Sequence, residues 1–450
     1  MTNSTSRKTQ AAVTGRELAL DMLLEILEKG GFCHIVKRQA LSKYQYLPKK
    51  ERALASRLTD GVVERLLSVD YAINQISNTK TAAMKPVIRN ILRLGAYQIL
   101  YMDKIPVSAA CNEAVKLTVK RHFAGLKGFV NGVLRSLARE KETIVFPDAS
   151  IGLSMPQWIL SMWEKDYGRE TAENIAAAFL EERPTCVRLN SKVAMEETVA
   201  SLEKQGVEVS ALEGFRDILY LKGYDHLEDL EAFRNGAIQV QDVSSSLVCR
   251  AASPKTGDFV LDVCGAPGGK SIHMADLLCG TGMVESRDLT WQKVRLIEDN
   301  IERTGFSNIR AREWDARVPD AEMKEKADIV LADLPCSGLG IIGRKPDIKY
   351  RASAKGLEDL AALQREILSV VWEYVKPGGR LVYSTCTINR RENEDNAEWF
   401  LEQFPFEPED ISGRLEGQFC EQSMKRGMLQ LFPDRHPSDG FFLAVFRRNV

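Results

Sequence analysis

Residues 259–271 read FVLDVCGAPGGKS, and this stretch decides how the C-terminal half of the chain is expected to fold. The apolar run Phe259–Val263 predicts a strand, and a helix is expected to begin near Lys270. The turn between them is rich in glycine, which lets the backbone turn tightly and approach a ligand closely. Its glycines are Gly265, Gly268 and Gly269. The free N–H groups at the start of the helix suit a carboxylate or a phosphate.

A glycine-rich turn by itself can be an ordinary tight connection between a strand and a helix. This turn is neither GxGxxG nor a P-loop, so it does not indicate a dinucleotide site. Two acidic residues favour a nucleoside ligand. Asp288 follows the next expected strand, where a carboxylate can accept hydrogen bonds from ribose hydroxyls. Asp315 ends the third strand, near where an adenine would lie. We therefore expect a nucleoside cofactor at this turn.

Apolar, strand-like runs alternate with helical stretches from about Gly236 onward. Strands are expected at 259–263, 283–286, 309–313, 329–332 and 380–383, with helices such as 291–303 and 357–375 between them. This alternation predicts a parallel α/β sheet covered by helices on both faces, which is a Rossmann-like domain.

The N-terminal part shows helical periodicity without an alternating strand pattern. Helices are expected at 17–29, 51–67, 86–102, 109–121 and 128–139, and helical pattern continues over 156–182. A small α+β module follows, with strands at 185–189, 207–209 and 218–221 around a helix at 194–205. We therefore expect a multidomain protein. Its domains are an all-α domain at 1–145, an α+β linker module at 146–235 and a catalytic α/β domain at 236–450.

The charge of the chain is distributed unevenly. The net charge is −1, but residues 1–145 hold 24 Lys and Arg against 12 Asp and Glu, a net charge of +12. The remainder holds 37 basic and 50 acidic residues, a net charge of −13. A basic N-terminal part suggests binding of a polyanion. A solvated, lysine-rich helical surface would explain the same charge.

Nine cysteines and five histidines show no metal-ligand spacing, so we expect no metal site. The first 15 residues lack the apolar core of a signal peptide, and the sequence has no apolar run of membrane-spanning length. We expect a cytoplasmic chain with reduced thiols and no membrane association.

Two cysteines follow expected strands that lie next to each other. Residues 327–338, ADIVLADLPCSG, bring Asp333 and Cys336 to a strand tip, and residues 378–387, GGRLVYSTCT, bring Cys386 to another. Adjacent parallel strands end at the same edge of a sheet, beside the cofactor turn. The sequence therefore predicts that two thiols and one carboxylate converge on one cleft.

Such a group of side chains suits methyl transfer to cytosine. Carbon 5 of cytosine is a poor nucleophile, but a thiolate that adds to carbon 6 makes carbon 5 enamine-like. A carboxylic acid near N3 would stabilise the charge that develops on the ring. Most cysteines are simply small buried apolar residues. We interpret Cys33, Cys111, Cys186, Cys249, Cys279 and Cys420 in this way, and Cys336 and Cys386 as functional.

These motifs resemble those of the RNA 5-methylcytosine methyltransferase family. The resemblance implies that Cys386 attacks the base, that Cys336 helps to release the product and that Asp333 contacts the base. It also implies S-adenosylmethionine (SAM) as the cofactor. The implied SAM positions are Cys264, Gly265, Ala266, Pro267, Gly268, Gly269, Lys270, Asp288, Asp315 and Asp333. Gly265 departs from the alanine that relatives often have, and we expect no consequence.

The N-terminal domain is similar to the transcription antitermination factor NusB, an RNA binder, through residues 105–115 and 128–135. A NusB-like domain joined to this catalytic domain resembles the Sun/Fmu type of bacterial small-subunit ribosomal RNA methyltransferases. The resemblance implies a specific cytosine of small-subunit ribosomal RNA as the target, in free RNA or an assembly intermediate, and we expect a monomer. Two alternatives stay open: a transfer RNA or protein substrate, and an RNA-binding assembly factor with an inactive catalytic domain.

Overall fold

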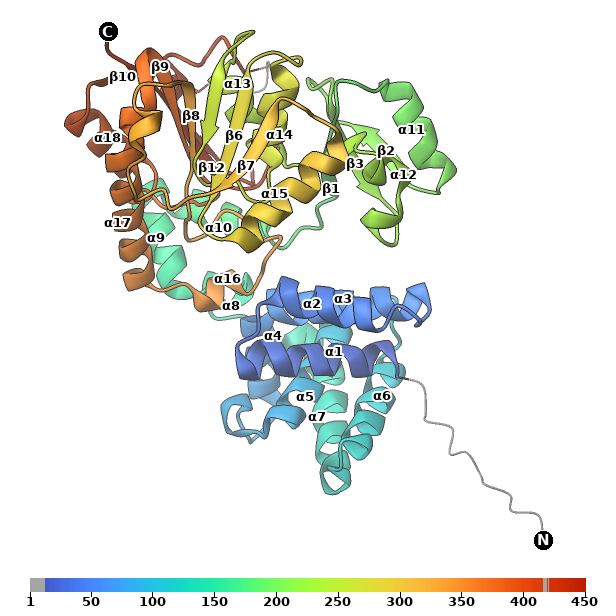
Figure 1. Cartoon of the computed structure of the whole chain (residues 1–450). Coiled ribbons are helices and arrows are strands. Elements are labelled where there is room, and N and C mark those ends of the chain that lie inside the picture. The colour runs from blue at the N-terminus through green and yellow to red at the C-terminus, as the bar shows by residue number, and fades with distance from the viewer. Residues whose placement is uncertain (1–12, 416–418, 420) are drawn as a thin grey trace. The chain divides into compact units, whose positions relative to one another are not determined.

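The structure is a computed structural model that describes residues 13–415, 419 and 421–450. The chain divides into two units (Figure 1). The first runs to Glu164 and includes residues 344–350, and the second contains residues 165–343 and 351–450. The domain boundaries expected after residues 145 and 235 stay predictions.

The first unit is helical, as the sequence predicts. Its helices are α1 (Gly15–Leu23), which continues as the π-helical η1 (Leu24–Glu28), α2 (Cys33–Lys43), α3 (Lys49–Glu64), α4 (Leu66–Ile76), α5 (Pro86–Tyr101), α6 (Val107–Lys120), α7 (Lys127–Glu140), α8 (Ala149–Gly152) and most of α9 (Gln157–Tyr167).

Helix α5 lies at the centre of this unit, because every residue from Asn90 to Ile99 is buried. A helix that is covered on all sides belongs in a core. Helix α3 approaches it closely at Gly61, where a Cβ atom would lie 1.9 Å from the ring of Tyr97. The buried Arg93 is neutralised by Asp70, with a 2.7 Å ion pair.

Three helices of the first unit were not expected from the sequence: α2, α4 and the four-residue α8. Helix α2 buries only Cys33, so it has no periodic apolar face to reveal it. The helix expected at 51–67 ends at Glu64, and α4 begins at Leu66. Between them Arg65 has φ −105° and ψ 20°, which is outside the α-helical region. Among the described residues, no helix has the length and apolar character needed to cross a membrane.

The segment 344–350 belongs to the helical unit although it comes late in the sequence. Its Tyr350 hydroxyl donates to the carbonyl of Val63 at 3.0 Å, and the Lys349 ammonium donates to the carbonyl of Glu64 at 2.8 Å. Burial lowers the pKa of Lys349 to about 7. This segment therefore packs against the junction of α3 and α4.

The second unit begins with helix α10 (Arg169–Ala178) and a small antiparallel sheet in the order β2-β3-β1-β4. The strands are β1 (Thr185–Leu189), β2 (Glu208–Ala211), β3 (Ile218–Lys222) and β4 (Ile238–Val240), and the helices are α11 (Met195–Lys204) and α12 (Glu231–Arg234). This is the α+β module that the sequence predicts, and β4 lies beyond the expected boundary at residue 235.

The larger sheet of this unit has the order β10-β12-β9-β8-β5-β6-β7, and β11 pairs with β12 (Figure 1). Its strands are β5 (Phe259–Asp262), β6 (Met283–Asp288), β7 (Ile309–Glu313), β8 (Ala327–Asp333), β9 (Val375–Thr385), β10 (Phe406–Pro408), β11 (Met428–Leu431) and β12 (Phe441–Arg448). Its helices are α13 (Val243–Ala252), α14 (Gly269–Leu277), α15 (Trp291–Thr304), α17 (Ala354–Val371) and α18 (Glu394–Gln403). The short helix α16 (Ile348–Arg351) lies mostly in the segment that belongs to the first unit.

The sheet is mixed, which the sequence-based expectation of a parallel sheet did not include. Strands β5 to β9 are parallel, whereas β10, β11 and β9 each pair antiparallel with β12. Strand β8 is buried on both faces: Ile329 and Leu331 belong to one core, and Val330 and Ala332 to another. Helices α13 and α14 contribute to the first core, and α17 and α18 to the second.

A buried ion pair joins the small module to the helix that follows the cofactor turn. The guanidinium of Arg188 in β1 binds the carboxylate of Asp276 in α14, and both side chains are less than 5% exposed. Arg188 also donates to Gln241, and Asp276 accepts from the amide and hydroxyl of Ser191. These contacts attach the small module to helix α14, which follows the cofactor turn.

We predict that Asp276→Asn destabilises the chain by about 3–5 kcal/mol, because it leaves the Arg188 charge buried without a counter-charge. The midpoint of thermal unfolding measures this loss. The control is Asp359→Asn, which breaks an exposed ion pair with Lys355 and should cost less than about 1 kcal/mol. Equal midpoints for the two variants would contradict the prediction.

Candidate active site

The cofactor turn leaves strand β5 at the point where the strand order of the sheet reverses. After β5 the chain adds β6 and β7 on one side of this strand, and then β8 and β9 on its other side. Ligands of open α/β sheets bind at the carboxyl ends of the strands at such a point. Helix α14 begins at Gly269, and the preceding Gly268 has φ +103°, a conformation that favours glycine.

Asp288, the last residue of β6, fixes the turn. Its carboxylate accepts from the amide of Ala266 at 3.0 Å and from its neighbour Leu289 at 2.8 Å, and it pairs with Lys293 at 2.9 Å. Asp315 lies two residues beyond the end of β7, and its carboxylate binds Arg317 at 2.7 Å. Hydrogen bonds from Arg317 lower the pKa of Asp315.

Two features show that the turn fits a ligand with an amino acid part. A Cβ atom on Gly269 would meet no atom within 4 Å, so the helix start is open. One carboxylate oxygen of Asp262, Oδ1, is buried without a hydrogen-bond partner among the described residues. Burial raises the pKa of Asp262 to about 7. A buried carboxylate oxygen is stabilised by a donor, and a ligand ammonium group is one.

The two predicted active-site thiols lie in contact. The sulfur atoms of Cys336 and Cys386 are 3.4 Å apart. They meet because β8 and β9 pair in parallel with Asp333 opposite Ser384, so each cysteine follows its strand by a few residues at the same edge. The hydrogen bond with Cys386, together with burial, raises the pKa of the Cys336 thiol well above its usual value. The surroundings therefore favour the protonated form of the Cys336 thiol.

Asp333 connects the thiols to the cofactor turn. Its carboxylate accepts from the Lys270 ammonium at 2.6 Å and from the Ser384 hydroxyl at 2.8 Å. Burial lowers the pKa of Lys270, but the Asp333 carboxylate outweighs burial, and the net shift is upward. The same ion pair links Lys270, in the first turn of α14, to the strand tip that precedes Cys336. Lys270 thus contributes to the thiol site as well as to the cofactor turn.

Comparisons with known proteins show the family to which the chain is similar. Residues 250–447 match the family model described as 16S rRNA methyltransferase RsmB/F. Residues 14–139 match the NusB family, and residues 155–226 match the ferredoxin-like domain of RsmF/B-like methyltransferases. A probable ribosomal RNA small subunit methyltransferase B of Bacillus subtilis is 36% identical, over 96% of this chain and 98% of the relative.

The chain belongs to the RsmB/F family of 16S rRNA methyltransferases. The ribosomal RNA small subunit methyltransferase B of Klebsiella pneumoniae is 31% identical over 96% of this chain and 98% of its own. The crystal structure of PH0851 has a TM-score of 0.80 and 26% identity, and it covers 98% of this chain and 100% of its own. The predicted family and the predicted three-part fold are therefore confirmed.

The remaining cysteines of this methyltransferase lie apart from the thiol pair. Cys33, Cys111, Cys186 and Cys249 are buried, as predicted. Cys279 is exposed, so its interpretation as a buried residue is wrong. It follows α14 with φ +50°, at the surface turn before β6. Cys420 lies outside the described residues. Cys264, in the cofactor turn, is partly exposed, and burial of its thiol raises its pKa.

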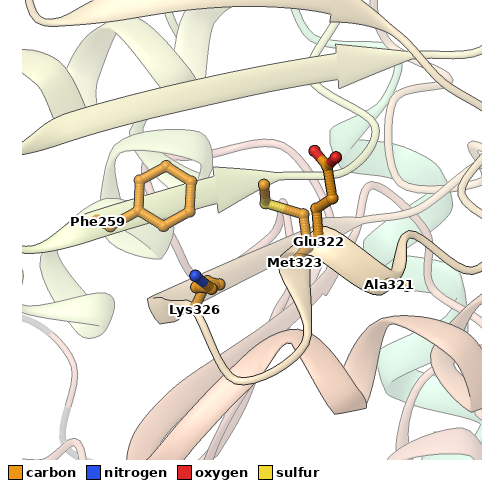
Figure 2. Close-up of a pocket in the computed structure, with 5 residues that line it drawn as sticks. All are labelled: Phe259, Ala321, Glu322, Met323 and Lys326. Atoms are coloured by element: carbon orange, nitrogen blue, oxygen red, sulfur yellow. The ribbon is translucent and has the colours of Figure 1, made fainter.

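An open pocket of about 690 Å³ lies at the opposite edge of the sheet from the thiols (Figure 2). It is lined by Phe259, Ala321, Glu322, Met323 and Lys326. Phe259 begins β5 and Lys326 immediately precedes β8, so the pocket is at the amino ends of these strands. Ligands of this fold bind at the carboxyl ends, and the pocket is not part of the candidate site.

Some residues that shape the site belong to no motif that the sequence analysis identified. Ser384 was seen only as part of the strand tip, although its hydroxyl binds Asp333. Glu392 and Asn393 lie just before α18, where polar residues are ordinary helix starts. Their burial and their contacts with the cysteine segments appear only in the folded chain.

The structure gives a consequence to Gly265, for which the sequence led us to expect none. A Cβ atom there would lie 2.1 Å from the Ser286 hydroxyl and 2.9 Å from the Ser271 hydroxyl. Those two hydroxyls are 2.7 Å apart, and Ser271 donates to the Asp262 carboxylate. Gly265 therefore makes room for a buried hydroxyl pair under the cofactor turn.

We predict that Gly265→Ala costs about 1–3 kcal/mol of stability through overpacking. Adding Ser286→Ala removes the nearest clashing atom, so the double variant should recover part of the loss. Thermal unfolding of the two single variants and the double variant measures the coupling. Strictly additive losses would show that Gly265 and Ser286 do not compete for space.

Proposed function

We propose that this chain transfers a methyl group from SAM to carbon 5 of a specific cytosine in small-subunit (16S) ribosomal RNA. Cys386 is the attacking nucleophile, and Cys336 assists release. The 3.4 Å contact of the two sulfur atoms beside the cofactor turn carries the proposal. A thiol pair at the carboxyl ends of neighbouring strands suits covalent catalysis on a base.

The cofactor turn and the two later strand ends would hold SAM, whose positively charged sulfur carries the methyl group. The open helix start at Gly269 suits its carboxylate, and the unpartnered oxygen of Asp262 suits its ammonium group. Asp288 is placed for the ribose hydroxyls. Asp315 would lie near the adenine. The backbone of residues 264–270 completes the set.

Lys270 and Asp333 prepare Cys386 for attack. A cation near a thiol favours the thiolate, which is the nucleophilic form of cysteine, and we assign this role to the Lys270 ammonium. The Cys386 sulfur bonds to carbon 6 of cytosine, which moves electron density to carbon 5. As the ring gains charge, N3 takes a proton from water, so the adduct stays neutral, and the Asp333 carboxylate accepts a hydrogen bond from the new N3–H group. Carbon 5 then takes the methyl group.

Release reverses the addition. Water takes the proton from carbon 5, and the electrons of that bond restore the double bond between carbon 5 and carbon 6 as the Cys386 sulfur departs as a thiolate. N3 gives its added proton back to water, which leaves neutral 5-methylcytosine. The raised pKa of Cys336 keeps its thiol protonated beside that sulfur, so it donates a hydrogen bond to the departing thiolate. A stabilised leaving group departs faster, which is the role proposed for Cys336.

We assign RNA binding to the helical N-terminal domain, residues 1–145, and to the module at 146–235. The N-terminal domain carries a net charge of +12, which suits the phosphate backbone. A groove of about 580 Å³ between α6 and α7 has two arginines in its lining, Arg135 and Arg139. The partner proposed is small-subunit ribosomal RNA, free or in an assembly intermediate, bound by a cytoplasmic monomer without metal.

We predict that the two cysteine variants fail differently. Cys386→Ala should form no covalent RNA adduct and transfer no methyl group. Cys336→Ala should attack and methylate, then stall as an adduct, because its departing thiolate has lost its donor. Incubation with SAM and small-subunit ribosomal RNA, followed by a denaturing gel, measures the adduct.

The matched control is Cys279→Ala, which alters an exposed thiol outside the site and should turn over normally. An adduct with Cys386→Ala alone would reverse the roles of the two cysteines. Full turnover by both active-site variants would refute covalent catalysis by this pair.

We also predict that Asp288→Ala weakens SAM binding by about 1–3 kcal/mol, because buried donors of the turn lose their acceptor. Isothermal titration calorimetry with SAM measures the affinity. Asp299→Ala serves as the control, since this carboxylate on α15 is exposed. Affinities that match in all three proteins would remove Asp288 from the cofactor site.

A further inference from the structure

The residues on both sides of Cys336 are held by one buried polar group. Glu392 is fully buried, and its carboxylate accepts from the Ser337 amide at 2.9 Å and from the Ser337 hydroxyl. The Gln364 amide donates to the same carboxylate and to the carbonyl of Pro335, both at 2.9 Å. Pro335 and Ser337 flank Cys336, so its backbone is fixed on each side.

The next residue in the sequence holds the other cysteine in the same way. The side chain of Asn393 is fully buried, accepts from the Thr385 hydroxyl at 2.6 Å and donates to the carbonyl of Thr387 at 3.0 Å. Thr385 and Thr387 flank Cys386. Consecutive side chains therefore hold the two cysteines, one each.

Hydrogen bonds also join the two cysteine segments to each other. The Leu339 amide donates to the Thr387 hydroxyl at 3.3 Å, and the hydroxyls of Thr387 and Ser337 are 2.7 Å apart. The Gly340 amide donates to the carbonyl of Cys386 at 3.1 Å. The Ser337 hydroxyl donates to Glu392, so this chain of donors ends at the carboxylate.

We propose that Glu392 and Asn393 are positioning residues that set the spacing between the Cys336 and Cys386 sulfur atoms. This inference rests on the proposed function, because the spacing matters only if both thiols act. Neither residue touches the reacting atoms in this account. They act through the backbone of the cysteine segments.

The chemistry of the contacts explains why position 392 needs a carboxylate. Its four donors are the Ser337 amide and hydroxyl, the Gln364 amide and the Asn389 amide at 2.8 Å. A carboxylate only accepts, and its two oxygens can take all four bonds. Glutamine has the same shape but points an N–H₂ group at two of these donors. Glu392→Gln therefore releases the segment that carries Cys336.

A chemical cross-link measures the sulfur spacing without RNA or SAM. Diamide oxidises two neighbouring thiols to a disulfide and takes up the two hydrogen atoms that they lose. Peptide mass spectrometry of the treated wild-type protein should show a bond between Cys336 and Cys386. Glu392→Gln and Asn393→Asp should lose this bond over the same exposure. Asn393→Asp replaces the donor to Thr387 with an oxygen.

Turnover provides the second measurement. A misplacement of about 1 Å can cost 100-fold in rate, so kcat of both variants should fall by about 100-fold. The KM for SAM should stay unchanged, because neither residue contacts the cofactor turn. Ser337→Ala keeps Glu392 and removes only one of its four donors. Its losses of cross-linking and of kcat should therefore be smaller than those of Glu392→Gln. Asp395→Asn removes an exposed carboxylate that pairs with Arg390, and it should match wild type in both measurements.

The two failures are distinguishable. Wild-type protein that cross-links but transfers no methyl group would refute the proposed function and leave the spacing role standing. The positioning role is overturned if folded Glu392→Gln or Ser337→Ala cross-links Cys336 to Cys386 at the wild-type rate, or if its kcat equals that of Asp395→Asn. A single cooperative thermal unfolding transition, with a midpoint near that of wild type, confirms that each variant tested is folded.

Discussion

The pairing of β8 with β9 is the constraint on which the site depends. These parallel strands place Asp333 directly opposite Ser384, and the Ser384 hydroxyl binds the Asp333 carboxylate. A shift of one residue would turn every side chain of one strand to the other face of the sheet. Both strands are buried in the sheet, with apolar cores on its two faces, so their register is strongly specified. The meeting of Cys336 and Cys386 follows from it.

Charge in this site is concentrated on one ion pair. The Lys270 ammonium is largely withdrawn from solvent, with its side chain 13% exposed, which disfavours its charge, and Asp333 compensates. Breaking a buried pair exposes the remaining partner to an uncompensated desolvation cost. The pair therefore ties the cofactor turn, which supplies Lys270, to the strand tip that supplies Asp333. In this arrangement the Lys270–Asp333 ion pair serves both the cofactor turn and the thiol site.

The sequence predicted the features that depend on local pattern. Strand Thr185–Leu189 and the strand at 309–313 are found as expected. The first is a short run rich in apolar and β-branched residues, and the second, IRARE, begins with the period-two alternation of apolar and charged residues that is typical of a strand. The convergence of Cys336, Cys386 and Asp333 followed from adjacent strand tips. The antiparallel strand β12 was missed, although Phe441–Arg448 begins with an apolar run that directly follows the turn dipeptide Asp439-Gly440. Its antiparallel pairing with β9 joins residues far apart in the sequence. Helix α2 was missed because it has almost no buried face.

The remaining features depend on contacts between residues far apart in the sequence. Gly265 leaves space for the Ser286 hydroxyl, 21 positions later in the sequence. Glu392 accepts a hydrogen bond from Ser337, 55 positions earlier. No local pattern reports such contacts, because each residue is unremarkable in its own segment. Polar networks of this kind are specific only when every member is satisfied, and that can be judged only in the folded chain.

Nucleoside mass spectrometry of 16S ribosomal RNA tests the central claim most directly. The RNA would be compared between cells that make this chain and otherwise identical cells that lack it. Our account predicts that 5-methylcytosine at one position is absent without the chain and returns when the chain is restored. Identical nucleosides in both RNAs, or a missing methyl group on any atom other than carbon 5 of cytosine, would contradict it.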